Sequence, residues 1–307
     1  MEKSEWKVSL HGGHSGEFCD HAEATLREML EAAVSAGYDT FGVSEHVPRH
    51  ESRFLYPEEV AMGWDIPKIH ADFARYAAHL QELVPEFEGR ISVLRGLEME
   101  IVPSAKYVSL MQDFRNQKLA DGSPAFDYAV GSVHYVDEIQ IDAAPASYLL
   151  AVEACGGIEA LAVRYYELVA EMALALRPEV VGHLDLIKRN LTLAGFGDFS
   201  LETPNIQAAA ESAMEAVRSV GAILDLNTAG WRKGLGEPYP APPLVQRAHA
   251  MGIGFCFGDD SHRPSDVGAG VPEAREYLLR CGVPTVTVLN REGVVMDART
   301  VQRVVAL

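Results

Sequence analysis

The chain has 307 residues, of which 48% are hydrophobic and 23% are charged, a composition typical of a folded globular protein. Its 26 basic and 44 acidic residues give a formal net charge of −18, which argues against nucleic acids and anionic membranes as partners. No apolar run has the length of a signal peptide or a membrane span, and the four scattered cysteines do not make a disulfide framework. We therefore expect a cytoplasmic protein, with its oligomeric state left open.

Short β-branched runs alternate with stretches of helical periodicity along the chain. The first strand is expected at residues 6–10, and Thr25 is expected to cap a helix that Gly37 ends. Further strands are expected at residues 38–44, 91–99, 126–134, 180–184, 222–226, 253–258 and 285–289, with helices at residues 66–84, 105–119, 158–176, 205–220, 243–250 and 272–281. These units predict an α/β protein with a parallel sheet, closed into a barrel or open, inside a layer of helices. No linker or repeat is visible, so we expect one domain over residues 1–307.

Two of the connecting segments, residues 46–65 and 135–157, are longer than a strand–helix unit needs. Both follow an expected strand. In a (β/α) barrel the loops after the strands build the active-site face. These two segments are therefore candidate walls of a substrate site.

Histidines recur where the expected strands end. They are His11 and His14 on the first strand, His21 in the loop after it, His46, His134 and His183 on the second, fourth and fifth, and His262 after the seventh. Two carboxylates, Glu98 on the third strand and Asp260 after the seventh, occupy equivalent places. One histidine at a strand end is usually structural, but independent structural roles do not explain seven. Imidazoles with a few carboxylates suit Zn²⁺, Fe²⁺ or Mn²⁺.

The donors are too many for one ion. Seven imidazoles and two carboxylates exceed the four to six positions around a single metal, so we expect two or three divalent ions, and Glu98 can bridge a pair of them. Such a site suits the hydrolysis of a small phosphate monoester. The structural interpretation is preferred for His50, His70, His79 and His249, which fall in loops or helices.

Several motifs then occur in one order along most of the chain. They are His14-Ser15-Gly16 with His21; Glu45-His46-Val47-Pro48-Arg49 with Phe54-Leu55-Tyr56-Pro57-Glu58-Glu59; Gly96-Leu97-Glu98-Met99-Glu100; Gly131-Ser132-Val133-His134 with Ile141-Asp142; Val181-Gly182-His183-Leu184-Asp185-Leu186; Asn227-Thr228-Ala229-Gly230; and Asp260-Ser261-His262. Together they resemble the polymerase and histidinol phosphatase (PHP) superfamily of metal-dependent phosphoesterases. Within it, the chain is most similar to the monofunctional histidinol-phosphatases, particularly the fungal type.

This resemblance implies a distorted, TIM-like (β/α)7 barrel with a trinuclear metal site at the carboxyl ends of its strands. One ion would take His11, His14, Glu98 and Asp260. A second would share Glu98 and take His134 and His183. The third would take His21, His46 and His262.

The start of the first motif departs from the family, which has His-x-His on one face of a strand. Here the residues are His11-Gly12-Gly13-His14. Two glycines could form a bulge that turns His11 back toward the site, which we favour. Alternatively, His11 points away and one metal is weakened or lost.

The resemblance also implies a reaction, the hydrolysis of L-histidinol phosphate to L-histidinol and phosphate. Metal ions would lower the pKa of a bound water toward about 7, and the resulting hydroxide would attack phosphorus in line. Glu98, Asp260 and His262 are the candidate catalytic residues. The alternatives are a phosphoesterase for another small phosphate monoester or a nucleotide, and a metal-binding protein that has lost its activity.

Other side chains have expected roles around this chemistry. Arg232, and after it Arg189 and Arg49, are candidates to bind the phosphate. Acidic residues of the two long segments, Glu51, Asp137 or Asp142, could hold the ammonium and imidazole groups of the substrate. Asp185 and Asp225 are expected to orient ligands or satisfy backbone groups. For Cys19, a small buried thiol is preferred to a redox role.

Overall fold

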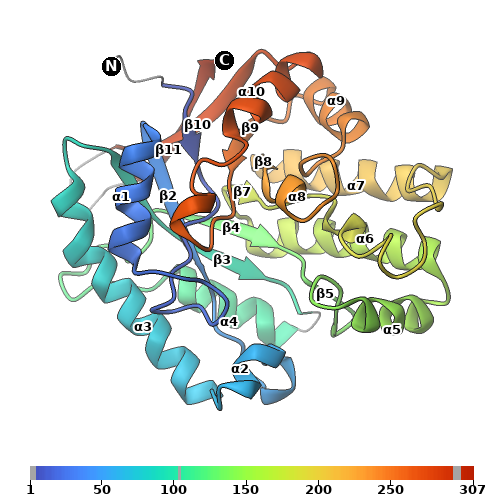
Figure 1. The fold of residues 1–307 in the computed structure, drawn as a ribbon, viewed down its shortest axis with the longest axis horizontal. Coiled ribbons are helices and arrows are strands. Elements are labelled where there is room, and N and C mark those ends of the chain that lie inside the picture. The colour runs from blue at the N-terminus through green and yellow to red at the C-terminus, as the bar shows by residue number, and fades with distance from the viewer. Residues whose placement is uncertain (1–4, 103–104, 293–298) are drawn as a thin grey trace.

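The computed structural model describes residues 5–102, 105–292 and 299–307. At its centre is a parallel sheet of seven strands in the order β1-β2-β3-β4-β7-β8-β9 (Figure 1). The strands are β1 (Val8–Ser9), β2 (Thr40–His46), β3 (Ser92–Glu100), β4 (Tyr128–Ser132), β7 (Val180–Val181), β8 (Ile223–Asn227) and β9 (Phe255–Gly258).

Hydrogen bonds beyond the strand ends join β1 to β9. The Leu10 backbone N–H donates to the carbonyl of Phe257 at 2.9 Å, and the Asp259 N–H donates to Ser9 Oγ at 3.2 Å. The sheet is therefore nearly closed. The predicted α/β fold, a distorted (β/α)7 barrel, is confirmed.

Inside the barrel, the Tyr128 ring leaves no room for a side chain at two positions on neighbouring strands. A Cβ atom at Gly96 would lie 2.5 Å from Tyr128 Cε1, and one at Gly42 would lie 2.8 Å from its Cζ. The Tyr128 hydroxyl donates to the carbonyl of Leu10 at 2.9 Å, so this side chain reaches across to β1. Glycine in the interior of these strands is thus explained by packing.

Helices surround the sheet (Figure 1). They are α1 (Leu26–Ala36), α3 (Ile66–Leu83), α4 (Ala105–Arg115), α6 (Ile158–Leu176), α7 (Pro204–Val220), α9 (Pro242–Ala250) and α10 (Val271–Arg280). The ends of α1 follow the predicted signals: Thr25 accepts a hydrogen bond from Glu28 N–H in a capping box, and Gly37 ends the helix with φ +76°.

The last predicted strand has a different role from the others. It is β10 (Thr285–Glu292), which pairs antiparallel with β11 (Arg299–Ala306), a strand that we did not predict, and it does not join the parallel sheet. Thr300 Oγ1 donates to the carbonyl of Asp127, just before β4, and Gln302 Nε2 donates to that of Gly221, just before β8. The hairpin therefore covers the amino ends of the barrel strands.

The two long segments are more ordered than predicted. They contain the helices α2 (Pro57–Ala61) and α5 (Pro145–Cys155), the hairpin strands β5 (Tyr135–Val136) and β6 (Ile139–Gln140), and the 3₁₀ turn η1 (Ser52–Phe54). The remaining short elements are η2 (Val84–Phe87), η3 (Leu186–Lys188), α8 (Ala229–Arg232) and η4 (Pro264–Asp266). Helix α5 was missed because its apolar residues run consecutively from Tyr148 to Val152, without the spacing of an amphipathic helix.

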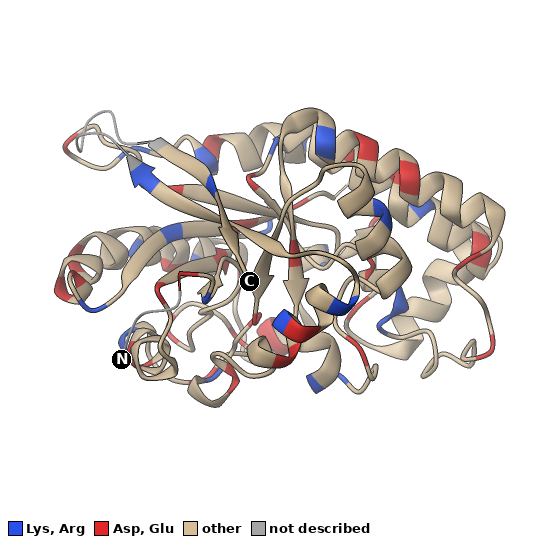
Figure 2. Ribbon diagram, turned by 90° about the horizontal axis from the view of Figure 1, so that it is seen from above, with Lys and Arg blue, Asp and Glu red and all other residues tan. Residues whose placement is uncertain are grey.

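Acidic and basic residues are interspersed along the outer helices (Figure 2). Among the described residues, no single helix is long and apolar enough to cross a membrane; α5 and α6 reach that length and composition only as a pair bent by 93°.

Candidate metal centre

Glu98, at the carboxyl end of β3, is surrounded by imidazoles. Its Oε1 lies 3.2 Å from His11 Nε2 and 3.5 Å from the Nε2 atoms of both His134 and His183. Its Oε2 lies 3.0 Å from His46 Nδ1. The five side chains come from β2, β3 and the segments that follow β1, β4 and β7, so the convergence of parallel strands brings them together.

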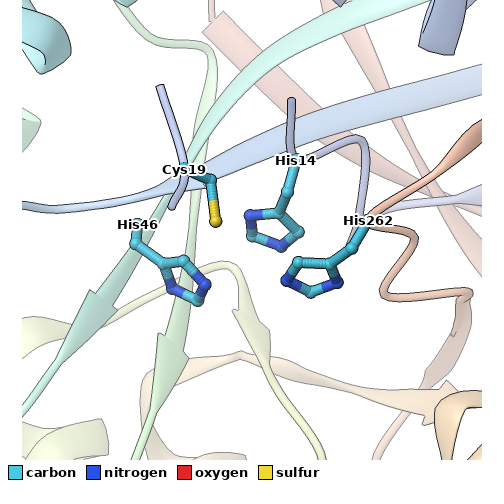
Figure 3. Close-up of side chains that lie close together, drawn as sticks. All are labelled: His14, Cys19, His46 and His262. Atoms are coloured by element: carbon cyan, nitrogen blue, oxygen red, sulfur yellow. The ribbon is translucent and has the colours of Figure 1, made fainter. Parts of the chain in front are cut away.

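A second group of side chains shares His46 with the first. It contains His14, Cys19, His46 and His262 (Figure 3), and one nitrogen or sulfur atom of each lies within 4.8 Å of those of the others. The His14 and His262 rings are stacked with centroids 4.3 Å apart. His21 lies at the edge of this group, 4.7 Å from the His262 ring and with 37% of its side chain exposed.

Asp260 and His183 complete the arrangement. Asp260 Oδ1 lies 3.7 Å from both His14 Nε2 and His262 Nδ1. His183 and Asp260 have φ angles of +27° and +47°, in the left-handed range that is uncommon for residues other than glycine. Such backbone geometry clusters at functional sites. The structure thus gathers all nine predicted ligands at one end of the barrel.

The two glycines of the first motif shape the backbone before His14. Gly12 and Gly13 have φ angles of +145° and +75°. A Cβ atom at Gly12 would lie 2.9 Å from the Ser261 backbone nitrogen, and one at Gly13 would lie 2.7 Å from Val43 Cγ1. The His11 ring points toward Glu98, which is the geometry of the favoured alternative, in which the glycines turn His11 toward the site.

Carboxylates stand behind three of the histidines. Asp225 Oδ2 lies 2.7 Å from His11 Nδ1, Glu45 Oε1 lies 3.2 Å from His14 Nδ1, and Glu100 Oε2 lies 3.1 Å from His134 Nδ1. Carboxylates in this position fix the orientation of a metal-binding imidazole. We had not predicted this role for Glu45 and Glu100, although Glu100 follows Glu98 at the period-two spacing that places both on one face of β3.

Asp185 and Cys19 make contacts of other kinds. Asp185 Oδ2 accepts a hydrogen bond from the Ala241 backbone N–H and lies 2.9 Å from Lys188 Nζ. Asp185 therefore satisfies a backbone group, one of its two expected roles, and pairs with a lysine. Cys19 is buried, with Sγ 3.4 Å from His21 Nδ1. Burial, followed by the charges of Glu45 and Asp20, raises the pKa of this thiol, as expected for a buried residue.

Buried acids and imidazoles share one small volume. Burial raises the pKa of Glu98, but the charges of His11 and His46 outweigh it and hold this pKa well below its usual value. The pKa of Asp260 is likewise kept low against burial by its neighbours His11 and His262. At His262, burial and the neighbouring His14 lower the pKa well below its usual value.

Burial lowers the pKa of His46 as well, so His46 and His262 favour the neutral form that metal binding requires. At His11, His14 and His134 burial also acts to lower the pKa, but the neighbouring carboxylates outweigh burial and raise this pKa. Ionised acids therefore lie among imidazoles of both kinds.

Unpartnered donor atoms provide a further test of fit. The Nε2 atoms of His14, His46 and His262 are buried without a hydrogen-bond partner in the part of the chain that the structure describes. Leaving a buried polar atom unpaired is costly, so such atoms call for a ligand. Imidazole nitrogens with carboxylate oxygens are donors that Zn²⁺, Fe²⁺ and Mn²⁺ accept. The cluster therefore fits divalent metal ions.

A cavity of about 410 Å³ lies against the cluster. Its lining includes Arg189, Arg232 and Lys233 as well as seven of the candidate ligands, His21, His46, His134, His183, His262, Glu98 and Asp260. Arg232 donates to the carbonyls of Asp259 and Asp260, and Arg189 Nε donates to the carbonyl of Asp142 at 2.6 Å. Lys233 was not predicted, because a lysine after a helical turn has no motif of its own.

Arg49 is the predicted phosphate ligand that does not line this cavity. Only 4% of its side chain is exposed, its guanidinium forms an ion pair with Glu59, and its Cζ lies 3.8 Å above the centre of the Tyr56 ring. Its contacts with Glu59 and Tyr56 give Arg49 a structural environment, while its Nε and Nη1 atoms are buried without a hydrogen-bond partner within the described residues. The phosphate contact of Arg49 stays a prediction.

Comparisons with known proteins identify the family of this chain. The model of the PHP domain matches residues 11–229. The "Probable histidinol-phosphatase" of Schizosaccharomyces pombe is 30% identical over 97% of this chain and 95% of its own length. The protein of the same name from Deinococcus radiodurans is 33% identical over 89% of this chain and 94% of its own length.

Solved structures share the fold. A candidate histidinol phosphatase from Listeria monocytogenes is 26% identical, with a TM-score of 0.72 over 87% of this chain and 99% of that chain. The histidinol phosphate phosphatase of Lactococcus lactis, crystallised with zinc, L-histidinol and phosphate, has a TM-score of 0.69 at 21% identity, over 93% of this chain and 97% of that chain. The chain thus belongs to the PHP domain family, among relatives named histidinol-phosphatases in fungi and bacteria.

Proposed function

We propose that this protein hydrolyses L-histidinol phosphate to L-histidinol and phosphate. The observation that carries the proposal is one cavity with two kinds of lining residue: imidazoles and carboxylates of the candidate metal centre, and the cationic side chains of Arg189, Arg232 and Lys233. Metal ligands beside cationic side chains suit the binding and hydrolysis of a phosphate ester. The names of the relatives support histidinol phosphate as the substrate.

Two or three divalent ions, zinc, iron or manganese, would be held by three groups of residues. The groups are His11, His14, Glu98 and Asp260; Glu98, His134 and His183; and His21, His46 and His262. The unpartnered buried Nε2 atoms of His14, His46 and His262 and the central position of Glu98 support this assignment. When bound, such ions supply positive charge that lowers the pKa of water and offsets charge on the phosphoryl group.

The protein side chains would divide the remaining tasks. Arg189 and Lys233, which line the cavity, would bind phosphate oxygens, and Arg232 would do so while holding the carbonyls of Asp259 and Asp260 in place. Asp260, ionised because its pKa is low, would accept a hydrogen bond from the attacking water. As the water oxygen bonds to phosphorus and the ester P–O bond breaks, the proton that the water gives up to Asp260 would pass to the oxygen of the leaving alcohol. His262, whose Nδ1 lies 3.0 Å from the Asp260 carbonyl, would hold that residue in place at the cavity.

Release of inorganic phosphate tests the proposal directly. The purified protein, stripped of metal and then supplied with Zn²⁺, Mn²⁺ or Fe²⁺, would be assayed on histidinol phosphate, nucleotides and other monoesters. We expect the highest kcat/KM for histidinol phosphate, loss of activity in Glu98→Gln, and retention in the exposed variant Asp198→Asn. Preference for a nucleotide would indicate another phosphoesterase, and no hydrolysis with any metal would indicate a metal-binding protein without activity.

Two broader proposals come from the composition alone. We propose a cytoplasmic location, because the four scattered cysteines do not make a disulfide framework. We also propose one domain over residues 1–307, because no linker is visible in the sequence. Complementation of a strain that lacks histidinol-phosphatase, in a medium without histidine, tests function in that compartment.

A further inference from the structure

Five acidic residues line the cavity, and four of them are accounted for. Glu98 and Asp260 lie among the histidines, Asp266 lies 3.7 Å from Arg232 Nε and 3.5 Å from Arg263 Nε, and Glu58 is exposed. The fifth is Asp142. Its Oδ1 is buried without a hydrogen-bond partner, and its carboxylate has no ion pair within residues 5–102, 105–292 and 299–307.

The backbone at Asp142 is held firmly while its carboxylate is left free. Arg189 Nε donates to the Asp142 carbonyl at 2.6 Å, and Asn190 Nδ2 donates to the Ile141 carbonyl at 2.9 Å. The Ile141 N–H donates in turn to the carbonyl of His134 at 2.9 Å. The backbone that carries this carboxylate is thus tied both to a candidate metal ligand and to a candidate phosphate ligand.

The other two acids proposed from the sequence lie elsewhere. Glu51 accepts a hydrogen bond from Arg53 Nε at 3.0 Å, and Asp137 accepts one from Arg164 Nε at 2.9 Å. Neither lines the cavity. Asp142 is therefore the acid of that set that lines the cavity and forms no ion pair within the described residues.

We propose that Asp142 binds the ammonium group of the substrate, so that the cavity selects phosphate esters that carry an amine near the ester. This inference rests on the proposed function. A cavity with two arginines, a lysine and metal ions attracts any phosphate, whereas a partly desolvated carboxylate favours a substrate that also brings a positive charge. Arg189 connects the proposed ammonium site to the proposed phosphate site, because its Nε donates to the Asp142 carbonyl while its side chain lines the cavity.

Asp142→Asn tests the assignment with two substrates. For histidinol phosphate we expect kcat/KM to fall roughly 30-fold, mostly through KM, because truncating one partner of a buried charge pair is costly. For p-nitrophenyl phosphate, which has no ammonium group, we expect little change. Asp137→Asn, an exposed acid of the same segment, is the matched control and should leave both substrates unaffected. An equal fall for both substrates, or no change for either, would overturn the proposal.

Calorimetric binding provides a readout that does not depend on turnover. The metal-loaded wild type should bind L-histidinol more tightly than its analogue without the amine, imidazolylpropanol, and Asp142→Asn should lose that preference. If histidinol phosphate is not hydrolysed but the preference is present and depends on Asp142, the proposed function fails and this assignment stands. If hydrolysis proceeds and Asp142→Asn keeps the preference, only this assignment fails.

Discussion

His11 Nδ1 lies 2.7 Å from Asp225 Oδ2, with both side chains fully buried. The same carboxylate accepts hydrogen bonds from the His183 backbone N–H at 2.5 Å and from Asn227 Nδ2 at 2.9 Å. One acid on β8 therefore sets the positions of two candidate ligands, from the segments after β1 and β7. With Nδ1 engaged, His11 presents Nε2 to Glu98.

We expect Asp225→Asn to weaken metal binding about 10- to 100-fold, because an orienting carboxylate behind a ligand affects affinity by that amount. Elemental analysis after dialysis against a weak chelator should show less metal per chain than in the wild type. Asp198→Asn, on an exposed residue, is the control. Unchanged metal content in Asp225→Asn, with a folded protein, would contradict a role for Asp225 in the site.

Gly12→Ala should be strongly destabilising and should displace His11. Its φ of +145° is a glycine conformation, and the added Cβ would lie 2.9 Å from the Ser261 nitrogen. Gly89→Ala is the matched control, because Gly89 also has a positive φ, of +78°, but a Cβ there meets no atom within 4 Å. We expect the free energy of unfolding to fall by about 1 kcal/mol in the control, from backbone conformation alone, and by roughly 3 kcal/mol or more in Gly12→Ala. If urea unfolding shows the same loss of unfolding free energy in Gly12→Ala and Gly89→Ala, then the packing around Gly12 does not matter for stability.

Sequence reasoning succeeded where local chemistry dictates structure. Thr25 and Gly37 delimit α1 through capping, and the period-two and strand-end patterns place Glu98, His134 and His183 at one end of the barrel. It did not reach contacts that only the folded chain makes. The enclosure of Arg49 by Glu59 and Tyr56 has no signal in the sequence, and β11 is defined only by its pairing with β10. Glu45 and Lys233 likewise acquire their surroundings only from the folded barrel.

Removal of metal should lower thermal stability as well as activity. Ions that bind only the native state stabilise it by RT ln(1 + [L]/Kd), about 4 kcal/mol at a thousandfold excess over Kd. Differential scanning calorimetry should show a lower Tm after chelation and recovery when Zn²⁺ or Mn²⁺ is restored. Glu98→Gln, which removes the central carboxylate, should respond much less to added metal. A Tm that does not depend on metal in the wild type would contradict occupation of the buried cluster.

Arg49→Met separates the structural interpretation of Arg49 from the phosphate role expected from the sequence. The ion pair with Glu59 is buried, so removal of the arginine leaves an uncompensated acid and should cost about 3–5 kcal/mol in the free energy of unfolding. The double variant Arg49→Met/Glu59→Gln should recover part of this loss. Arg189→Met, in the cavity wall, should instead raise KM for the phosphate ester and cost less stability than Arg49→Met, because it removes one hydrogen bond, to the Asp142 carbonyl, and breaks no buried ion pair. If urea unfolding and KM show the reverse pattern, in which Arg49→Met weakens substrate binding without loss of stability, then Arg49 reaches the phosphate and Glu59 serves only to guide it there.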